Sequence, residues 1–214
     1  MNEVKLNTIR ALIGEATPKI GRFEAMILLA HILGKPKEYL IAHDDEELPD
    51  TTLMTFDVYV SMRLDGVPVA YLTGRQEFFG RYFTVDHNVL IPRPDTEVLI
   101  EQALIVAPEK PEILDMGTGS GCIALTLAAE CPCWKGMAVD ISEKALDMAR
   151  INAKALNAAD RVNFLHADFT AADFAERLPE EFRSPCLIVS NPPYGERLME
   201  KREAEGLYRD FGRA

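Results

Sequence analysis

Hydrophobic residues recur at helical spacing in the first third of the chain. One set lies at intervals of three and four residues, which places its members on one face of a helix. Its members are Phe23, Met26, Ile27, Ala30 and Leu33. Gly34 and Pro36 come next and predict the end of this helix. A second helix is predicted over residues 51–64, with Asp50 or Thr51 as its N-cap. The first part of the chain therefore predicts a small helical domain, which we expect to dock on the rest of the chain or on a partner.

Residues with high β-propensity alternate with polar ones in the segment that follows. They are Tyr71, Leu72, Phe78, Phe79, residues 82–85 and residues 89–91. This pattern predicts a β-hairpin connector over residues 71–94. Residues 92–95 read Pro-Arg-Pro-Asp, which ends the extended segment and caps a helix with apolar positions between residues 98 and 106.

From residue 112 onward, short apolar runs alternate with helical patterns. Strands are predicted over residues 112–116, 136–140, 162–165 and 186–190, with helices over residues 122–130 and after Ser142. This alternation predicts an α/β domain with a parallel sheet, which we assign to residues 95–214. The 214 residues, 48% of them hydrophobic, suffice for one large core and a small second domain.

Composition and charge narrow the class of protein. No apolar run approaches the length of a membrane span, and the start of the chain lacks a signal-peptide pattern. Cys131-Pro132-Cys133 lacks a second ligand pair, so we expect no zinc site and a reducing, cytoplasmic location. The net charge of −11 is unfavourable for binding nucleic acid, although it leaves room for a local basic patch.

The four residues Asn191, Pro192, Pro193 and Tyr194 follow the last predicted strand. Proline cannot continue a sheet, so Asn191 is held at the edge where open α/β sheets bind ligands. Its oxygen and nearby carbonyl groups can accept the hydrogens of a planar –NH2 group, on which a tyrosine ring can stack. Acceptors on these hydrogens favour the pyramidal nitrogen of nucleophilic attack. The motif predicts alkylation of a conjugated amino nitrogen; the alternative is a proline-rich turn without chemistry.

A glycine-rich turn separates the first of these strands from its helix. Its residues are Gly117, Thr118, Gly119, Ser120 and Gly121. Glycines at alternate positions let the backbone pass close to a ligand. The spacing matches neither the dinucleotide fingerprint nor a P-loop. On its own, such a turn could be only a tight connection.

Acidic residues after the next two strands support a binding role for this turn. Asp140 ends the second strand, roughly 20 residues on, where a carboxylate can hold ribose hydroxyls. Asp168 and Phe169 follow the third strand and suit the edge and face of an adenine ring. Together with Asn191, these residues predict an S-adenosylmethionine site that faces an amino-group acceptor.

Four segments of the chain resemble one enzyme family. Residues 68–75, 90–97, 113–121 and 188–194 are similar to the protein-(glutamine-N5) methyltransferases, the HemK/PrmC family. That family methylates the glutamine of the Gly-Gly-Gln motif in bacterial peptide chain release factors. The first two segments distinguish it, because Asn-Pro-Pro-Tyr is shared with enzymes that methylate adenine, cytosine and guanine amino groups.

The resemblance implies a Rossmann-like methyltransferase sheet, S-adenosyl-L-methionine as cofactor, and release factors as partners in translation termination. Residues 1–70 would recognise the substrate. The implied cofactor ligands are Gly117, Thr118, Gly119, Ser120, Gly121, Asp140, Asp168, Phe169 and Asn191. The implied catalytic residues are Asn191, Pro192, Pro193 and Tyr194. Arg93 would line the substrate site, unless it pairs with Glu97.

The sequence after Tyr194 departs from this family. It is more similar to the corresponding region of ribosomal RNA guanine-N2 methyltransferases, and Leu198, Arg202, Glu205 and Tyr208 indicate an amphipathic helix. An RNA amino-group methyltransferase is therefore one alternative. No strand is predicted after residue 190, so the fourth strand would have an uncovered edge. A fragment, a truncated gene product, a hybrid or an obligate oligomer would each fit this expectation, as would an inactive binding fragment.

Overall fold

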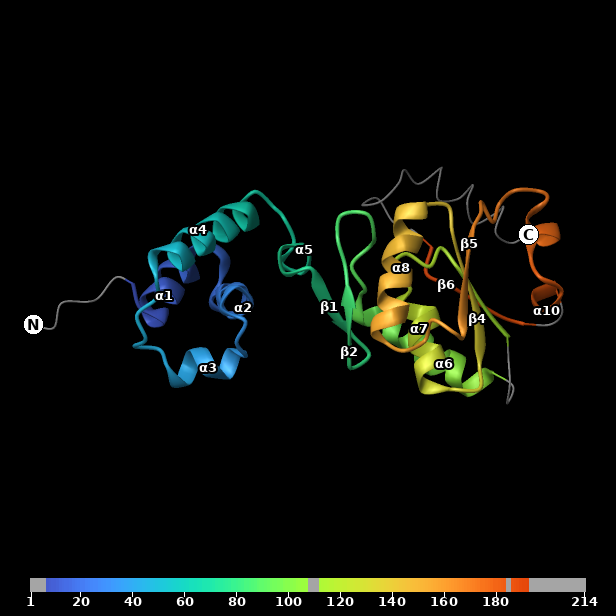
Figure 1. Ribbon diagram of the computed structural model, residues 1–214, viewed down its shortest axis with the longest axis horizontal. Helices are drawn as coiled ribbons and strands as arrows, with labels where there is room; N and C mark the ends of the chain where they lie inside the picture. The colour runs from blue at the N-terminus through green and yellow to red at the C-terminus, as the bar shows by residue number, and fades with distance from the viewer. Residues whose placement is uncertain (1–6, 108–111, 184–185, 193–214) are drawn as a thin grey trace, which may run out of the picture. The chain divides into compact units, whose positions relative to one another are not determined.

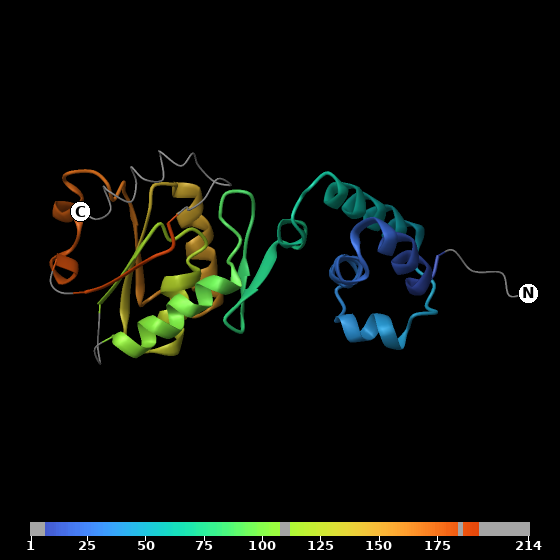
Figure 2. The same ribbon diagram turned by 180° about the vertical axis from the view of Figure 1, so that it is seen from behind.

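The computed structural model describes residues 7–107, 112–183 and 186–192. The chain divides into two compact units, Met1–Gly74 and Arg75–Ala214, which can be followed by colour in Figure 1 and from behind in Figure 2. The tail helix expected after Tyr194, together with Pro193 and Tyr194, lies outside the described residues.

The described part of the helical unit is built from short helices around one apolar core. They are α1 (Ile9–Ile20), α2 (Arg22–Leu33), α3 (Lys37–Ala42), α4 (Asp50–Leu64) and α5 (Val69–Thr73). The fully buried side chains include Ile9, Leu28, Leu29 and Leu40. Helix α2 ends at Gly34, which has a left-handed φ of 61°, so the predicted end is confirmed. Helix α4 begins at Asp50 after Pro49, so the predicted cap at Asp50 or Thr51 is wrong: Pro49 takes the extended N-cap position and Asp50 lies in the first turn.

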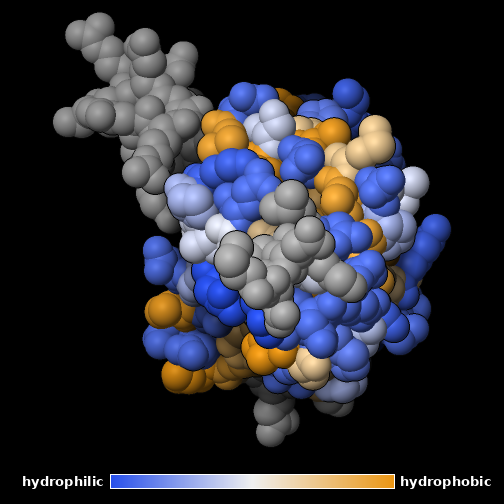
Figure 3. Space-filling view, turned by 90° about the vertical axis from the view of Figure 1, so that its left-hand side faces the viewer, coloured by the Kyte–Doolittle hydropathy of each residue, from blue (hydrophilic) through white to orange (hydrophobic). Residues whose placement is uncertain are grey.

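Hydrophilic residues cover most of the face of the helical unit seen in Figure 3, with separate hydrophobic patches between them. The exposed hydrophobic side chains of helix α4 include Met54, Val58 and Met62. They are spaced by four residues and therefore share one face of the helix.

The connector contains a shorter hairpin than the sequence predicts. Strands β1 (Arg75–Phe78) and β2 (Arg81–Thr84) are antiparallel, with Phe78 opposite Arg81. Phe79 and Gly80 form the turn, and both have positive φ, as a type I′ hairpin turn requires.

Two parts of the predicted connector are not strands. Tyr71 and Leu72 lie in helix α5, whose N-cap is Pro68, so their assignment as strand residues is wrong. Residues 89–91 are not extended into a strand either. The carboxylate of Asp86 accepts the backbone N–H of Asn88 at 2.8 Å, and this turn ends strand pairing before residue 89.

The α/β unit contains a parallel sheet, as predicted. Its described strands are β3 (Glu112–Met116), β4 (Lys135–Asp140), β5 (Val162–His166) and β6 (Leu187–Ser190), in the order β5-β4-β3-β6. All neighbouring pairs are parallel. The helices are η1 (Pro94–Thr96), α6 (Glu97–Val106), α7 (Cys122–Glu130), α8 (Glu143–Ala155), α9 (Phe174–Arg177) and α10 (Glu180–Arg183). The predicted cap is confirmed for α8, where the Ser142 hydroxyl accepts the Ala145 N–H.

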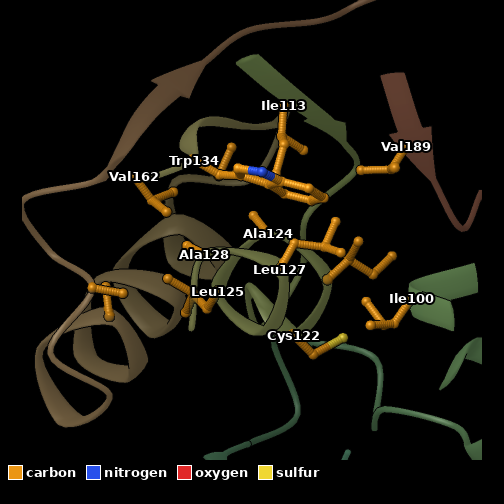
Figure 4. Packing of buried hydrophobic residues seen from close by; sticks show 14 of the residues in the cluster. Ile100, Ile113, Cys122, Ala124, Leu125, Leu127, Ala128, Trp134, Val162 and Val189 are labelled. Atoms are coloured by element: carbon orange, nitrogen blue, oxygen red, sulfur yellow. The ribbon is translucent and has the colours of Figure 1, made fainter. Parts of the chain in front are cut away.

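Successive side chains of the strands enter two different cores. Ile113 packs with residues of α6 and α7 and with Trp134, as Figure 4 shows. Leu114 faces the opposite side and packs with Phe174 and Phe182 of the short helices α9 and α10. The sheet is therefore covered on both faces, which suits the apolar runs of its strands.

The described residues contain no helix that is long and apolar enough to cross a membrane. In the same part of the chain, no three or more His, Cys, Asp or Glu side chains are grouped in a way that could hold a metal ion. The four cysteines all lie in the described part of the chain, and no disulfide joins any two of them.

Candidate active site

The order of the strands defines a switch point between β3 and β6. The chain passes from β3 through α7 to β4 on one side, whereas β6 lies on the other side of β3. Met116 is paired with Ser190, and the Ser190 hydroxyl donates to the Met116 carbonyl at 2.6 Å. The residues after these two strand ends, Gly117 and Asn191, therefore leave the sheet side by side. Open α/β sheets bind ligands at such a point.

The glycine loop has the backbone that its sequence requires. Gly117, Gly119 and Gly121 have φ values of 75°, 56° and 81°, a region that other residues rarely adopt. Added Cβ atoms at Gly117 and Gly119 would meet no other atom within 4 Å. One side of the loop is therefore open to a ligand, and the backbone can approach it closely.

The buried carboxylate of Asp115 holds the glycine loop in place. Its side chain is 0% exposed. One carboxylate oxygen accepts the Thr118 hydroxyl at 2.6 Å and the Ala124 N–H at 3.2 Å. Burial raises the pKa of Asp115 to about 6, and the two donors oppose this rise. Asp115 is not among the site residues predicted from the sequence, although an acid inside an apolar strand directly before a glycine turn is a signal for such a role.

Buried oxygen atoms beside the loop lack partners. The second oxygen of Asp115 and the hydroxyl of Ser120 have no hydrogen bond in the described part of the chain. Orphaned acceptors and a glycine cradle with open space fit a polar ligand at this loop.

Asp140 is brought directly to the glycine loop. One of its oxygens accepts the Gly119 N–H at 2.9 Å and the other accepts the Ser142 N–H at 2.9 Å. The Gly117 and Thr118 N–H groups also donate to the carbonyl of Val139, the preceding residue. The end of β4 and the loop after β3 thus form one hydrogen-bonded unit.

Asp168 and Phe169 lie after β5, next along the same edge. The Ala167 N–H donates to the Asp140 carbonyl at 3.1 Å, which joins the ends of β4 and β5. One Asp168 oxygen accepts both the hydroxyl and the N–H of Thr170, and these bonds lower the pKa of Asp168. Asp168 is exposed, and its lowered pKa keeps it ionised at neutral pH; Phe169 is partly buried.

Asn191 contacts a residue that the sequence analysis missed. Its side-chain Nδ2 donates to the hydroxyl of Thr96 at 3.0 Å. Thr96 is buried in the turn that precedes α6, and its N–H donates to the Arg93 carbonyl. The Pro-Arg-Pro segment and the end of β6 therefore meet, although 95 residues separate the two partners.

Arg93 is exposed at this turn. Glu97, which the sequence offers as an ion-pair partner for Arg93, accepts a hydrogen bond from the backbone N–H of Phe79 at 2.9 Å. No ion pair between Arg93 and Glu97 is found among the described residues. Pro192 is half-buried.

Asn152 is a second buried side chain whose contacts were not predicted. The sequence places it on the packed face of helix α8, where it is 1% exposed. Its amide accepts the Thr84 N–H at 2.7 Å and donates to the carbonyl groups of Thr84 and Ser120. Asn152 thus joins the connector hairpin to the glycine loop.

Two family models match the chain. The RMKL-like methyltransferase domain matches residues 97–214, which is more than half of the chain. The PrmC N-terminal domain matches residues 6–74.

Curated relatives cover most of the chain. A release factor glutamine methyltransferase from Chlorobaculum tepidum is 40% identical over 88% of this chain and 66% of its own length. The enzyme of that name from Neisseria gonorrhoeae is 44% identical over 82% of this chain and 62% of its own. The chain thus spans slightly less than two thirds of these relatives. Among solved structures, TrmN from Thermus thermophilus matches with a TM-score of 0.41 and 33% identity, over 53% of this chain and 31% of that one. This chain belongs to the RMKL-like methyltransferase-domain family, and its first unit matches a PrmC N-terminal domain.

Proposed function

We propose that this protein transfers a methyl group from S-adenosylmethionine to the side-chain amide nitrogen of the Gly-Gly-Gln glutamine in peptide chain release factors. The observation that carries the proposal is the pairing of Met116 with Ser190. It brings the glycine loop and Asn191 to one point of the sheet edge. A cofactor held by the loop would therefore face an acceptor held by Asn191.

The cofactor half of the site follows the order of the strands. The open side of the glycine loop would receive the amino-acid part of the cofactor. Asp140 would hold the ribose hydroxyls, because each carboxylate oxygen keeps lone-pair capacity beside its present N–H donor. Asp168 and Phe169 would contact the adenine edge and face. When bound, S-adenosylmethionine supplies an electrophilic methyl group.

The acceptor half of the site is built to hold an –NH2 group. The Asn191 side-chain oxygen and the backbone carbonyl of Pro192 would accept its two hydrogens, and Tyr194 would pack on its face. An amide nitrogen is a poor nucleophile because its lone pair is delocalised into the carbonyl group. Acceptors on both hydrogens favour the pyramidal nitrogen of the transition state over the planar ground state. Positioning supplies the rest of the catalysis, and the proton leaves after transfer.

The helical unit and Arg93 would serve recognition of the release factor. The PrmC N-terminal domain match over residues 6–74 supports this assignment of the first unit. Arg93 lies on the turn that contacts Asn191 through Thr96, which favours a place beside the substrate. The role would be in translation termination, in the cytoplasm.

A second candidate function is methylation of an RNA amino group. It is favoured by the RMKL-like match, which includes residues 195–214, and by the similarity of that tail to ribosomal RNA guanine-N2 methyltransferases. The net charge of −11 and the match of the first unit to a PrmC domain oppose it.

The test is transfer of a labelled methyl group in a mixture of purified release factor and ribosomal RNA. We expect label in the release factor, and none when its Gly-Gly-Gln glutamine is changed. Label in RNA would support the second candidate instead. We assign Asn191 to the acceptor half of the site, because it contacts Thr96, although the resemblance also counts it among the cofactor ligands. The Asn191→Ala variant should therefore keep most of its cofactor affinity and lose transfer; equal loss of both would refute the division between the two halves of the site.

A further inference from the structure

Thr96 is the residue through which the turn before α6 reaches the acceptor half of the site. It is 7% exposed, and its hydroxyl accepts a hydrogen bond from Asn191 Nδ2 at 3.0 Å. A buried hydroxyl on this turn is not needed to start α6, because no side chain caps that helix. Its contact with Asn191 therefore calls for another explanation.

The orientation of the Asn191 amide decides which groups it can bind. The oxygen of a primary amide only accepts hydrogen bonds, and its nitrogen only donates them. A glutamine –NH2 group offers two donors, so Asn191 must present its oxygen. If the Asn191 amide were rotated by 180°, its own –NH2 group would face the substrate –NH2 group, and two hydrogen-bond donors would oppose each other. Holding Nδ2 on Thr96 leaves the Asn191 oxygen for the substrate.

Both ends of this hydrogen bond are anchored. On one side, Thr96 donates its N–H to the Arg93 carbonyl, and α6 is fixed in the core by the fully buried Ile100. On the other side, the hydroxyl of Ser190 holds the end of β6 to Met116. The Thr96 hydroxyl therefore defines a fixed point for the Asn191 side chain.

We propose that Thr96 is a positioning residue for methyl transfer, whose hydroxyl holds Asn191 with its oxygen directed to the substrate –NH2 group. The proposal rests on the proposed function and deepens it. The hydroxyl fixes the position of the amide, and the substrate –NH2 group then selects the observed orientation, because a hydroxyl can bind either end of an amide and only this orientation leaves an acceptor for the substrate. Loss of the hydroxyl should lower kcat and leave cofactor binding unchanged.

The test compares Thr96→Val, which keeps the side-chain shape, with Thr96→Ser, which keeps the hydroxyl. We expect Thr96→Val to lower kcat by about 2- to 12-fold, the equivalent of one hydrogen bond, with little change in the KM for release factor. Thr96→Ser should retain most of the wild-type kcat. Cofactor affinity, measured by calorimetry, should be the same in all three proteins.

Thr126→Val is the matched control. Thr126 is a fully buried threonine of α7 whose hydroxyl has no hydrogen-bond partner in the described residues. The same substitution should therefore leave kcat unchanged, and melting curves of both valine variants would show whether they fold alike.

Hydrogen exchange of the Asn191 side-chain amide gives a second test that does not depend on catalysis. In nuclear magnetic resonance spectra, the side-chain –NH2 protons of Asn191 should exchange with water faster in Thr96→Val than in the wild type or Thr96→Ser. Unchanged exchange, an unchanged kcat in Thr96→Val, or an equal loss in Thr96→Ser would each overturn the positioning role. A wild-type chain that methylates no release factor would instead overturn the proposed function, and the positioning role with it.

Discussion

Asp140 accepts the backbone N–H of Gly119 through one carboxylate oxygen at 2.9 Å. Its other oxygen accepts the Ser142 N–H at the start of α8. A single side chain therefore joins the glycine loop, the end of β4 and the next helix. A ligand that binds Asp140 contacts a carboxylate whose position is already fixed, so little ordering is needed on binding.

Replacing Asp140 should weaken cofactor binding. We expect Asp140→Ala to reduce the affinity for S-adenosylmethionine by about 1–3 kcal/mol, because the variant would lose both the proposed hydrogen bonds to the ribose and the acceptor of the Gly119 N–H. Titration calorimetry measures this change. Asp147→Ala is the control, since Asp147 is an exposed acid of α8 that pairs with Arg150. Equal affinities of the Asp140→Ala variant and the wild type would contradict the assignment.

The stability of the cofactor-free protein should carry a pH dependence from Asp115. The pKa of this carboxyl is raised from 3.8 to about 6 by burial, so the folded state binds a proton that the unfolded state has lost between these values. The free energy of unfolding therefore falls as pH rises through this window, by about 1–3 kcal/mol.

Asp115→Asn removes this titrating group while keeping the side-chain shape. Relative to the wild type, this variant should gain stability as pH rises from about 4 to about 6. Denaturant unfolding at a series of pH values measures the difference, with Asp147→Asn as the exposed control. A constant difference across that range would show that Asp115 does not titrate there.

Gly121 should not tolerate a side chain. Its φ is 81°, and an added Cβ would lie 2.8 Å from Leu125 Cδ1 and 3.1 Å from Ala149 Cβ. We expect Gly121→Ala to destabilise the protein by about 1–3 kcal/mol. Gly14→Ala, in helix α1 with open space around it, should be neutral or stabilising. Thermal melting compares the two, and similar melting temperatures would contradict the described loop.

Asn152→Ala should loosen the connector hairpin. The substitution removes the acceptor of the Thr84 N–H and the donor to the carbonyl groups of Thr84 and Ser120. We expect a cost of about 1–3 kcal/mol and faster hydrogen exchange at the Thr84 amide. Lys154→Ala, at an exposed position of the same helix, should change neither. If Thr84 exchanges at the wild-type rate in Asn152→Ala, the link between hairpin and loop is not formed.

Much of the fold follows from local sequence. The four strands β3 to β6 are short apolar runs with turn residues after them, and Gly34 ends its helix through a conformation that glycine favours. The connector was predicted too long because Tyr71 and Leu72 have high β-propensity. Both residues lie in helix α5 instead, because packing overrides local propensity there: Leu72 is part of the core of the helical unit.

The site could be predicted only in part. The glycine loop, Asp140 and Asn191 each follow a strand, so their common edge was predictable from the parallel sheet. The strand order that makes β3 and β6 neighbours could not be predicted from the sequence, because it depends on packing over the whole domain. Thr96 and Asn152 were missed for the same reason: their partners lie 95 and 68 residues away, and neither residue type signals such a contact.

The most direct test of the proposed function is to locate the transferred methyl group by mass spectrometry. Release factor would be incubated with this protein and S-adenosylmethionine, digested, and its peptides fragmented. We expect one added methyl group on the side chain of the Gly-Gly-Gln glutamine. A release factor that remains unmethylated, or carries the methyl group on another residue, would contradict it.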